Sequence, residues 1–134
     1  FILNAGPWGD GSVPQETRQV FQDMGKWLRV NGESIYGCGK TRHLYREALD
    51  GGYYCISGIW TGKPGALYFH TLRWTGETNS LRVEGVKILS AQLLASGRSL
   101  EFTQEGDRLV VYGLPSEVPD PYDTVIKFTY QDMD

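Results

Sequence analysis

The chain has 134 residues, of which 40% are hydrophobic, 13% aromatic and 22% charged, a composition that is typical of a folded globular domain and excludes an intrinsically disordered chain. Its net charge of −3 leaves no basic stripe to neutralise phosphates, so neither nucleic acid nor a membrane is expected as a partner. The sequence has no apolar run of the roughly 20 residues that a membrane helix needs.

The chain begins with three consecutive apolar residues, at positions 1–3. A run without polar alternation predicts a strand that is buried on both faces, as in a parallel sheet, and such a strand needs neighbours to cover it. Residues 5–14 follow with three glycines and two prolines. This composition predicts a loop whose backbone can approach a ligand or a neighbouring loop closely.

A helix is predicted next, over residues 15–31. Ser12 and Gln15 have the spacing of a capping box, and Pro14 falls in the first turn, where its missing N–H group is harmless. Asn31 and Gly32 predict a left-handed stop. The apolar residues recur with a period of 3.6 and predict one buried face, with Trp27 in the core. They are Val20, Phe21, Met24, Trp27 and Leu28.

After Gly37 the helical periodicity is replaced by short β-prone segments between glycine and proline turns. The change predicts a domain boundary near residues 31–34. Residues 39–51 are compatible with an irregular loop or with a short helix. Seven strands are predicted, at residues 53–60, 66–74, 81–83, 86–94, 99–103, 108–112 and 124–130.

Strands at this spacing predict two antiparallel sheets packed as a sandwich. The TGKPG sequence between the first two predicts a hairpin turn, and the three prolines of residues 114–123 predict a crossing loop. The predicted fold class is therefore mainly β, an antiparallel β-sandwich preceded by a strand and a helix like one repeat of a (β/α) barrel.

Few side chains offer catalytic or metal-binding chemistry. The 16 acidic residues show no spacing that marks a catalytic pair. His43 and His70 are isolated, so exposed or hydrogen-bonded structural roles are expected, and no metal or cofactor is expected. Cys38 and Cys55 fit no zinc or redox motif, and we prefer two packed thiols to a disulfide, although both are compatible with the spacing.

Five aromatic residues of the β-rich part allow two interpretations: Tyr53, Tyr54, Trp60, Tyr68 and Trp74. We favour packing inside the sandwich, because sheet interiors collect such residues. The alternative is an exposed aromatic platform that binds sugars, as in sandwich lectins.

The sequence resembles the C-terminal end of the retaining α-L-fucosidases of glycoside hydrolase family twenty-nine. Five segments carry the resemblance and occur in the family's order: LNAGPWGDGSVP, GKWLRVNGESIYG, SAQLLASGRSLEF, GDRLVVYGLP and PDPYDTVIKF. The likeness spans nearly the whole chain, and the order makes it specific. Trp8 stands where the family commonly has an acidic residue, and residues 38–54 fit the family poorly.

The resemblance implies that residues 1–33 are the final βα unit of a catalytic (β/α) barrel and that residues 34–134 are the C-terminal β-sandwich. The chain would begin at or just before the last barrel strand. In this family the nucleophile and the acid/base come from upstream strands, so no catalytic residue is expected here. Asn4 and Trp8 fall where a barrel strand meets its loop, and they are the candidate substrate-binding residues. Contacts within their own loop are the alternative for each.

The chain is expected to be the C-terminal part of an α-L-fucosidase, an enzyme that hydrolyses α-L-fucosyl linkages in glycans. This part would brace the barrel and would not be catalytic alone. The expected partners are the N-terminal barrel portion of the same enzyme and a fucosylated glycan, and the oligomeric state stays open. A secreted, periplasmic or lysosomal compartment is favoured over the cytoplasm. Two alternatives are an autonomous carbohydrate-binding module and an assembly domain whose helix docks on a partner chain.

Overall fold

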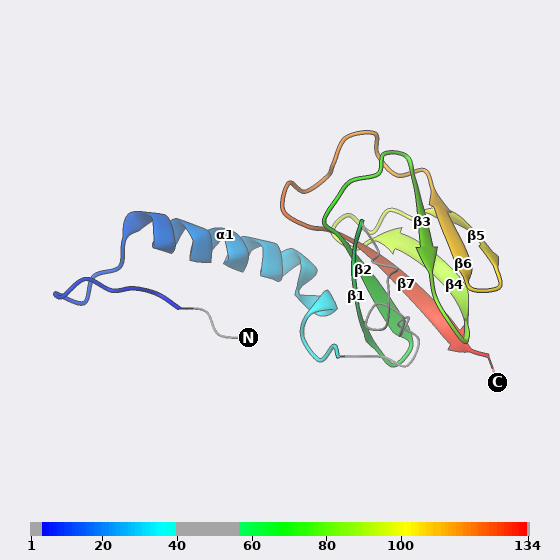
Figure 1. Ribbon diagram of the computed structural model, residues 1–134, viewed down its shortest axis with the longest axis horizontal. Coiled ribbons are helices and arrows are strands. Elements are labelled where there is room, and N and C mark those ends of the chain that lie inside the picture. The colour runs from blue at the N-terminus through cyan, green and yellow to red at the C-terminus, as the bar shows by residue number, and fades with distance from the viewer. Residues whose placement is uncertain (1–3, 40–56, 134) are drawn as a thin grey trace, which may run out of the picture. The chain divides into compact units, whose positions relative to one another are not determined.

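The computed structural model describes residues 4–39 and 57–133 (Figure 1). The predicted strand at residues 1–3 lies outside them, as do nearly all of the ambiguous residues 39–51 and the start of the predicted strand 53–60. The chain divides into two compact units, Phe1–Gly32 and Glu33–Asp134.

The first unit contains the helix α1 (Gln15–Asn31), whose bounds match the prediction. Pro14 is its N-cap residue, and no side chain caps the first turn. The predicted capping box was wrong, because Ser12 lies two residues before the N-cap and binds Asp10 instead of the first turn of the helix. Its Oγ donates a hydrogen bond to Asp10 Oδ1 at 2.7 Å, and its N–H donates to the same oxygen at 2.9 Å.

The helix α1 ends in a tighter 3₁₀ turn and not at a left-handed residue. Gly32 has a φ of −58°, its N–H donates to Leu28 O, and the chain continues into the 3₁₀-helix η1 (Gly32–Ser34). The predicted left-handed stop at Asn31 and Gly32 was therefore wrong, since a 3₁₀ turn can satisfy the last carbonyls instead. A left-handed glycine follows only at Gly37, with a φ of +71°.

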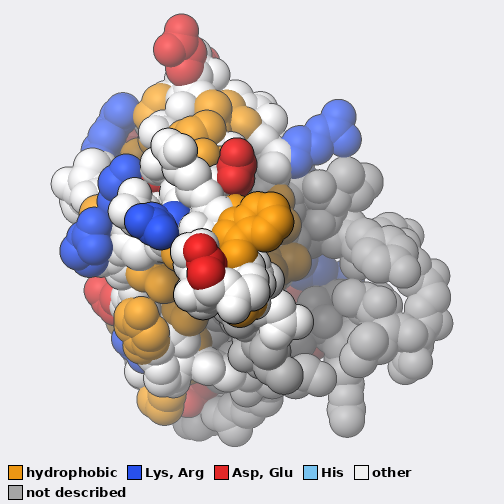
Figure 2. Space-filling view, turned by 90° about the vertical axis from the view of Figure 1, so that its left-hand side faces the viewer, with side chains coloured by type: hydrophobic (Ala, Val, Ile, Leu, Met, Phe, Trp, Pro, Cys, Tyr) orange, Lys and Arg blue, Asp and Glu red, His pale blue; other side chains and the backbone are white. Residues whose placement is uncertain are grey.

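The apolar stripe of α1 is not fully enclosed. Val20 is 55% exposed. The other residues of the stripe are each partly buried: Phe21, Met24, Trp27 and Leu28. Trp27, predicted in the core, is thus only half-buried, and Asn31 is the one fully buried residue of this helix. The space-filling view likewise shows hydrophobic side chains at the surface among charged ones (Figure 2).

The second unit is an antiparallel β-sandwich, as predicted. Its described residues form seven strands: β1 (Gly58–Lys63), β2 (Ala66–Thr71), β3 (Thr78–Arg82), β4 (Val86–Leu93), β5 (Glu101–Glu105), β6 (Arg108–Tyr112) and β7 (Thr124–Asp132). One sheet has the order β1-β2-β7-β4 and the other has the order β3-β6-β5. Figure 1 shows the two sheets as separate layers. The proline-rich residues 114–123 form no strand, so the predicted crossing loop is confirmed.

The first hairpin is longer than predicted. The strand β1 runs to Lys63, because Thr61, Gly62 and Lys63 pair with the first residues of β2. The turn is reduced to Pro64 and Gly65, and Gly65 has a φ of +81° that suits glycine. The predicted TGKPG loop therefore contributes three residues to the strand and two to the turn.

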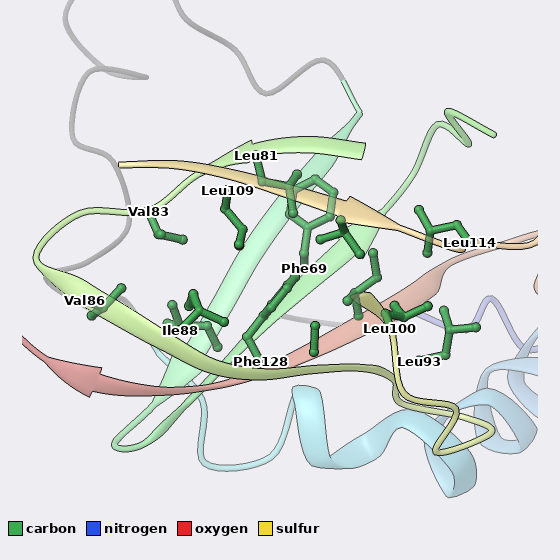
Figure 3. Packing of buried hydrophobic residues seen from close by; sticks show 14 residues of the cluster. Phe69, Leu81, Val83, Val86, Ile88, Leu93, Leu100, Leu109, Leu114 and Phe128 are labelled. Atoms are coloured by element: carbon green, nitrogen blue, oxygen red, sulfur yellow. The ribbon is translucent and has the colours of Figure 1, made fainter. Parts of the chain in front are cut away.

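The core lies between the two sheets (Figure 3). Its innermost residues come from the central strands and are fully buried: Leu67 and Phe69 of β2, Ile126 and Phe128 of β7, and Leu109 and Val111 of β6. Every residue of β2 is buried. Since Tyr68 and His70 alternate with the core residues of β2, they point to the outer face of the four-stranded sheet.

A glutamine side chain joins the edges of the two sheets. Gln104 of β5 accepts a hydrogen bond from Ile88 N at 2.9 Å and donates one to Val86 O at 2.7 Å. The side chain thus satisfies backbone groups of β4 that the sheet itself leaves open. Leu89, next to Ile88, is the extra residue of a β-bulge and is exposed.

Candidate functional site

The candidate substrate-binding residues Asn4 and Trp8 lie in the loop before α1. Residues 8–12 close on themselves, because Trp8 N donates to Ser12 O at 2.7 Å and Gly11 N donates to Trp8 O at 2.8 Å. Gly11 has a φ of +83°, which glycine adopts without strain. The turn therefore holds the backbone of Trp8 in place.

The side chains of these two residues face solvent. The indole of Trp8 is 64% exposed, and Asn4 is exposed as well. An exposed indole presents a flat apolar face that can pack against another ring, and an amide can both donate and accept hydrogen bonds. The loop thus presents one apolar ring face and one polar amide to solvent.

Asp10 is the carboxylate nearest to Trp8 in the sequence. The hydrogen bonds that it accepts from the Ser12 hydroxyl and the Ser12 N–H lower the pKa of Asp10 from its ordinary value. Because these bonds favour the charged form, the side chain closes the turn as a carboxylate and is not poised to supply a proton.

His70 is buried on the outer face of β2. Its Nδ1 lies 2.7 Å from Asp123 Oδ2, and its Nε2 lies 2.9 Å from Thr61 Oγ1. The Thr61 hydroxyl also donates a hydrogen bond to Ser34 O at 2.6 Å. The predicted hydrogen-bonded role is confirmed for His70, whereas His43 lies outside the described residues.

The aromatic residues proposed for a sugar-binding platform are packed instead. The Trp60 ring lies 4.9 Å from that of Phe69 and contacts the core. Trp74 also packs against the core, and its Nε1 donates to Pro115 O at 3.0 Å. Tyr68 is fully buried. Packing inside the sandwich is therefore confirmed for Trp60 and Trp74, whereas Tyr68 is buried on the outer face of the four-stranded sheet. Tyr53 and Tyr54 lie outside the described part of the chain.

Sequence analysis missed a polar cluster around Glu33. Tyr68 Oη donates to Glu33 Oε1 at 2.7 Å, Lys127 Nζ donates to the same oxygen, and Lys63 Nζ donates to Glu33 O at 3.2 Å. Lys127 and, secondarily, Tyr68 lower the pKa of Glu33, while burial and the Glu33 carboxylate raise the pKa of Tyr68. No local pattern signals the cluster, because Glu33 is 35 positions from Tyr68 and 94 from Lys127.

The remaining reactive groups form no further site among residues 4–39 and 57–133. Cys38 carries a free thiol, as preferred from the sequence, and Cys55 is not among these residues. No group of three or more His, Cys, Asp or Glu side chains there could hold a metal ion. None of the helices described is long and apolar enough to cross a membrane.

Comparison with known proteins shows which longer proteins the chain is similar to. No protein-family model matches the chain. The tissue α-L-fucosidase of Macaca fascicularis is 28% identical over 136 residues, covering 96% of the chain and 28% of that protein. The plasma α-L-fucosidase of Rattus norvegicus is 30% identical over 120 residues, covering 85% of the chain and 25% of that protein. The structure of α-L-fucosidase isoenzyme 1 from Paenibacillus thiaminolyticus has a TM-score of 0.74 and 33% identity, covering 98% of the chain and 30% of that protein.

The fold by itself defines a β-sandwich domain that follows a helix. The homologues and structural neighbours, which include proteins of glycoside hydrolase family twenty-nine, are α-L-fucosidases. The chain is similar to a C-terminal-like segment of these longer proteins and spans 25–30% of the length of the three named above.

Proposed function

We propose that the chain is the C-terminal part of a retaining α-L-fucosidase, which hydrolyses α-L-fucosyl linkages in glycans. The observation that carries the proposal is the coverage: 98% of the chain matches the Paenibacillus enzyme, yet only 30% of that enzyme is matched. In this proposal the sandwich braces the catalytic portion and has no activity of its own.

The division of labour follows from what the family's chemistry needs. A retaining glycosidase uses two carboxyl groups about 5–5.5 Å apart, one as nucleophile and one as acid/base. We infer that both come from the N-terminal barrel portion, and that residues 1–33 complete this barrel as its last βα unit. The partly uncovered stripe of α1 supports the inference, since the outer helices of such barrels bury one apolar face against the strands.

Asn4 and Trp8 are proposed as residues at the rim of the substrate pocket. Active sites of (β/α) barrels lie at the ends of the strands from which the βα loops start. The loop 4–14 precedes α1, so it occupies this position in the proposed final unit. The exposed Trp8 indole would then stack on the apolar face of a sugar, and Asn4 would bind a hydroxyl group.

We expect the purified 134-residue chain to show no hydrolysis of an aryl α-L-fucoside, because it lacks the catalytic pair. A chimera of the Paenibacillus enzyme whose matching C-terminal portion is replaced by this chain is expected to hydrolyse the substrate. In this chimera Trp8→Ala should raise KM several-fold with kcat little changed.

The matched control for Trp8→Ala is Tyr122→Ala, which removes another exposed aromatic side chain from the sandwich. Turnover by the isolated chain would refute the proposed division of labour. A chimera that is folded by circular dichroism and monodisperse, yet inactive, would count equally against it.

The isolated chain is also expected to self-associate and to bind a dye specific for apolar surfaces. The reason is the partly uncovered stripe of α1, which has no barrel to cover it in the isolated chain. The double variant Val20→Lys, Met24→Lys should reduce both self-association and dye binding. The control double variant Gln19→Lys, Gln22→Lys, which adds the same charge outside the stripe, should reduce neither. A monomer with no dye binding in size-exclusion and fluorescence measurements would contradict this expectation.

The alternative of an autonomous carbohydrate-binding module required a solvent-facing row of aromatic residues. Trp60, Trp74 and Tyr68 are packed, so this observation favours the enzyme segment over the module.

A further inference from the structure

The first residues of the second unit form a short segment, residues 33–39, that we call the strap. It contains Glu33, whose carboxylate and carbonyl oxygens accept hydrogen bonds from β2, β7 and β1. Farther along, Ser34 O accepts from Thr61 at 2.6 Å and Gly39 N donates to Gly62 O at 2.9 Å. The strap is thus attached to the four-stranded sheet at both of its ends.

The groups that bind the Glu33 carboxylate and Ser34 O lie on one row across the sheet. The register pairs Thr61 with Tyr68 and Tyr68 with Lys127, so these residues are neighbours on three successive strands. The next row carries the core residue Phe69, which points to the opposite face. One carboxylate therefore holds the strap to β2 and β7 together.

The groups around Glu33 make this attachment depend on charge. Lys127, Lys63 and Tyr68 face it from the sheet, and Cys38 Sγ lies 3.5 Å from Glu33 O within the strap. His70, which pairs with Asp123, is linked to the strap through the Thr61 hydroxyl. Glu33 is thus the strap's direct ionic contact with the sheet among these groups.

We propose that the strap is an acid-releasable element, for which Glu33 is the latch: protonation of its carboxylate detaches residues 33–39 from the outer face of the sheet. A neutral carboxyl group loses the ion pair with Lys127 and the charge-assisted hydrogen bond from the buried Tyr68. The contacts that remain are hydrogen bonds of the strap's main-chain atoms, and they join Glu33 O to Lys63 Nζ, Ser34 O to Thr61 Oγ1 and Gly39 N to Gly62 O.

The direction of the pH dependence follows from the pKa of Glu33. Lys127 and Tyr68 hold this pKa below its ordinary value of 4.5 in the attached state. The attachment therefore contributes fully above the ordinary value and is lost as the pH falls through the lowered one. This inference concerns the chain by itself and stands whether or not the proposed enzymatic function is correct.

The test is residue-resolved hydrogen exchange of the 134-residue chain, followed at the amides of Cys38 and Gly39, which donate to Ile35 O and Gly62 O. After correction for intrinsic rates, the protection of these amides should fall at least about tenfold between about pH 7 and pH 3. In the Glu33→Gln variant, the amides of Cys38 and Gly39 should have at every pH the low protection that the unmodified chain reaches only at acidic pH. The matched control Glu101→Gln, on an exposed position of β5, should behave as the unmodified chain does.

Unchanged protection of the β2 and β7 amides shows that the sheet itself stays folded in these measurements. A Glu33→Gln chain that keeps the protection of the unmodified chain overturns the proposal, and so does one that keeps the pH dependence of the unmodified chain. Lys127→Met provides an independent arm. Because Lys127 is the main cause of the lowered pKa, this variant should move the release midpoint to higher pH, and an unmoved midpoint also overturns the proposal.

Discussion

Replacing Phe128 by alanine is expected to lower the free energy of unfolding of the sandwich by about 3–5 kcal/mol. Phe128 is completely buried in β7, a central strand that pairs with both β2 and β4. Its ring lies 5.6 Å from that of Trp60 and between the two sheets (Figure 3). The substitution therefore removes apolar burial and leaves a cavity that surrounding strands cannot close without losing their register.

Urea denaturation followed by far-ultraviolet circular dichroism measures this effect. Tyr122→Ala is the control, because Tyr122 is 71% exposed and its removal should change the stability by no more than about 0.5 kcal/mol. A loss below about 1 kcal/mol for Phe128→Ala would show that the two sheets do not pack around this ring.

Replacing Gly58 by alanine is expected to cost about 3 kcal/mol or more, although it adds a single methyl group. A Cβ atom at this position would lie 1.9 Å from His70 O and 2.8 Å from Phe69 Cζ. The first of these is a backbone atom of the paired strand β2, so it cannot move away as a flexible side chain can. Relief of the clash requires β1 to separate from β2 at its first residues.

The same denaturation experiment tests the Gly58 prediction against Gly39→Ala. Among residues 4–39 and 57–133, no atom outside its chain neighbours lies within 4 Å of a Cβ built at Gly39, and its φ is not in the left-handed region, so a change within about 0.5 kcal/mol is expected there. Equal stability of the two variants would mean that β1 does not approach β2 as closely as described.

The strands were predictable where their side chains alternate. Leu67 and Phe69 alternate with Tyr68 and His70, although β2 is buried on both faces. Arg108–Tyr112 was found with its bounds unchanged, because its two buried residues alternate with less buried ones. The end of β1 was not predictable. Gly62 and Lys63 have low β-propensity, and only their pairing with β2 extends the strand through them.

The ends of α1 show why local motifs can fail. Ser12 has the correct spacing for a capping box, but its hydroxyl donates a hydrogen bond to the nearby carboxylate of Asp10 instead. The Glu33 cluster failed to appear for a different reason, since its partners meet only after β2 and β7 pair. Trp8 was predictable as a loop residue from the glycines and prolines around it, whereas its exposure depends on the turn that closes at Ser12.

The glutamine that joins the two sheets also protects the molecule against other copies of itself. An outer strand of a sheet can recruit a strand from another chain through its open backbone groups, which is a route to aggregation. Along β4 these groups are already used: Val86 O and Ile88 N bind Gln104, Ala91 O accepts from Leu100 N, and Leu93 N donates to Arg98 O. A foreign strand would have to displace these internal bonds before it could add to this border of the sheet.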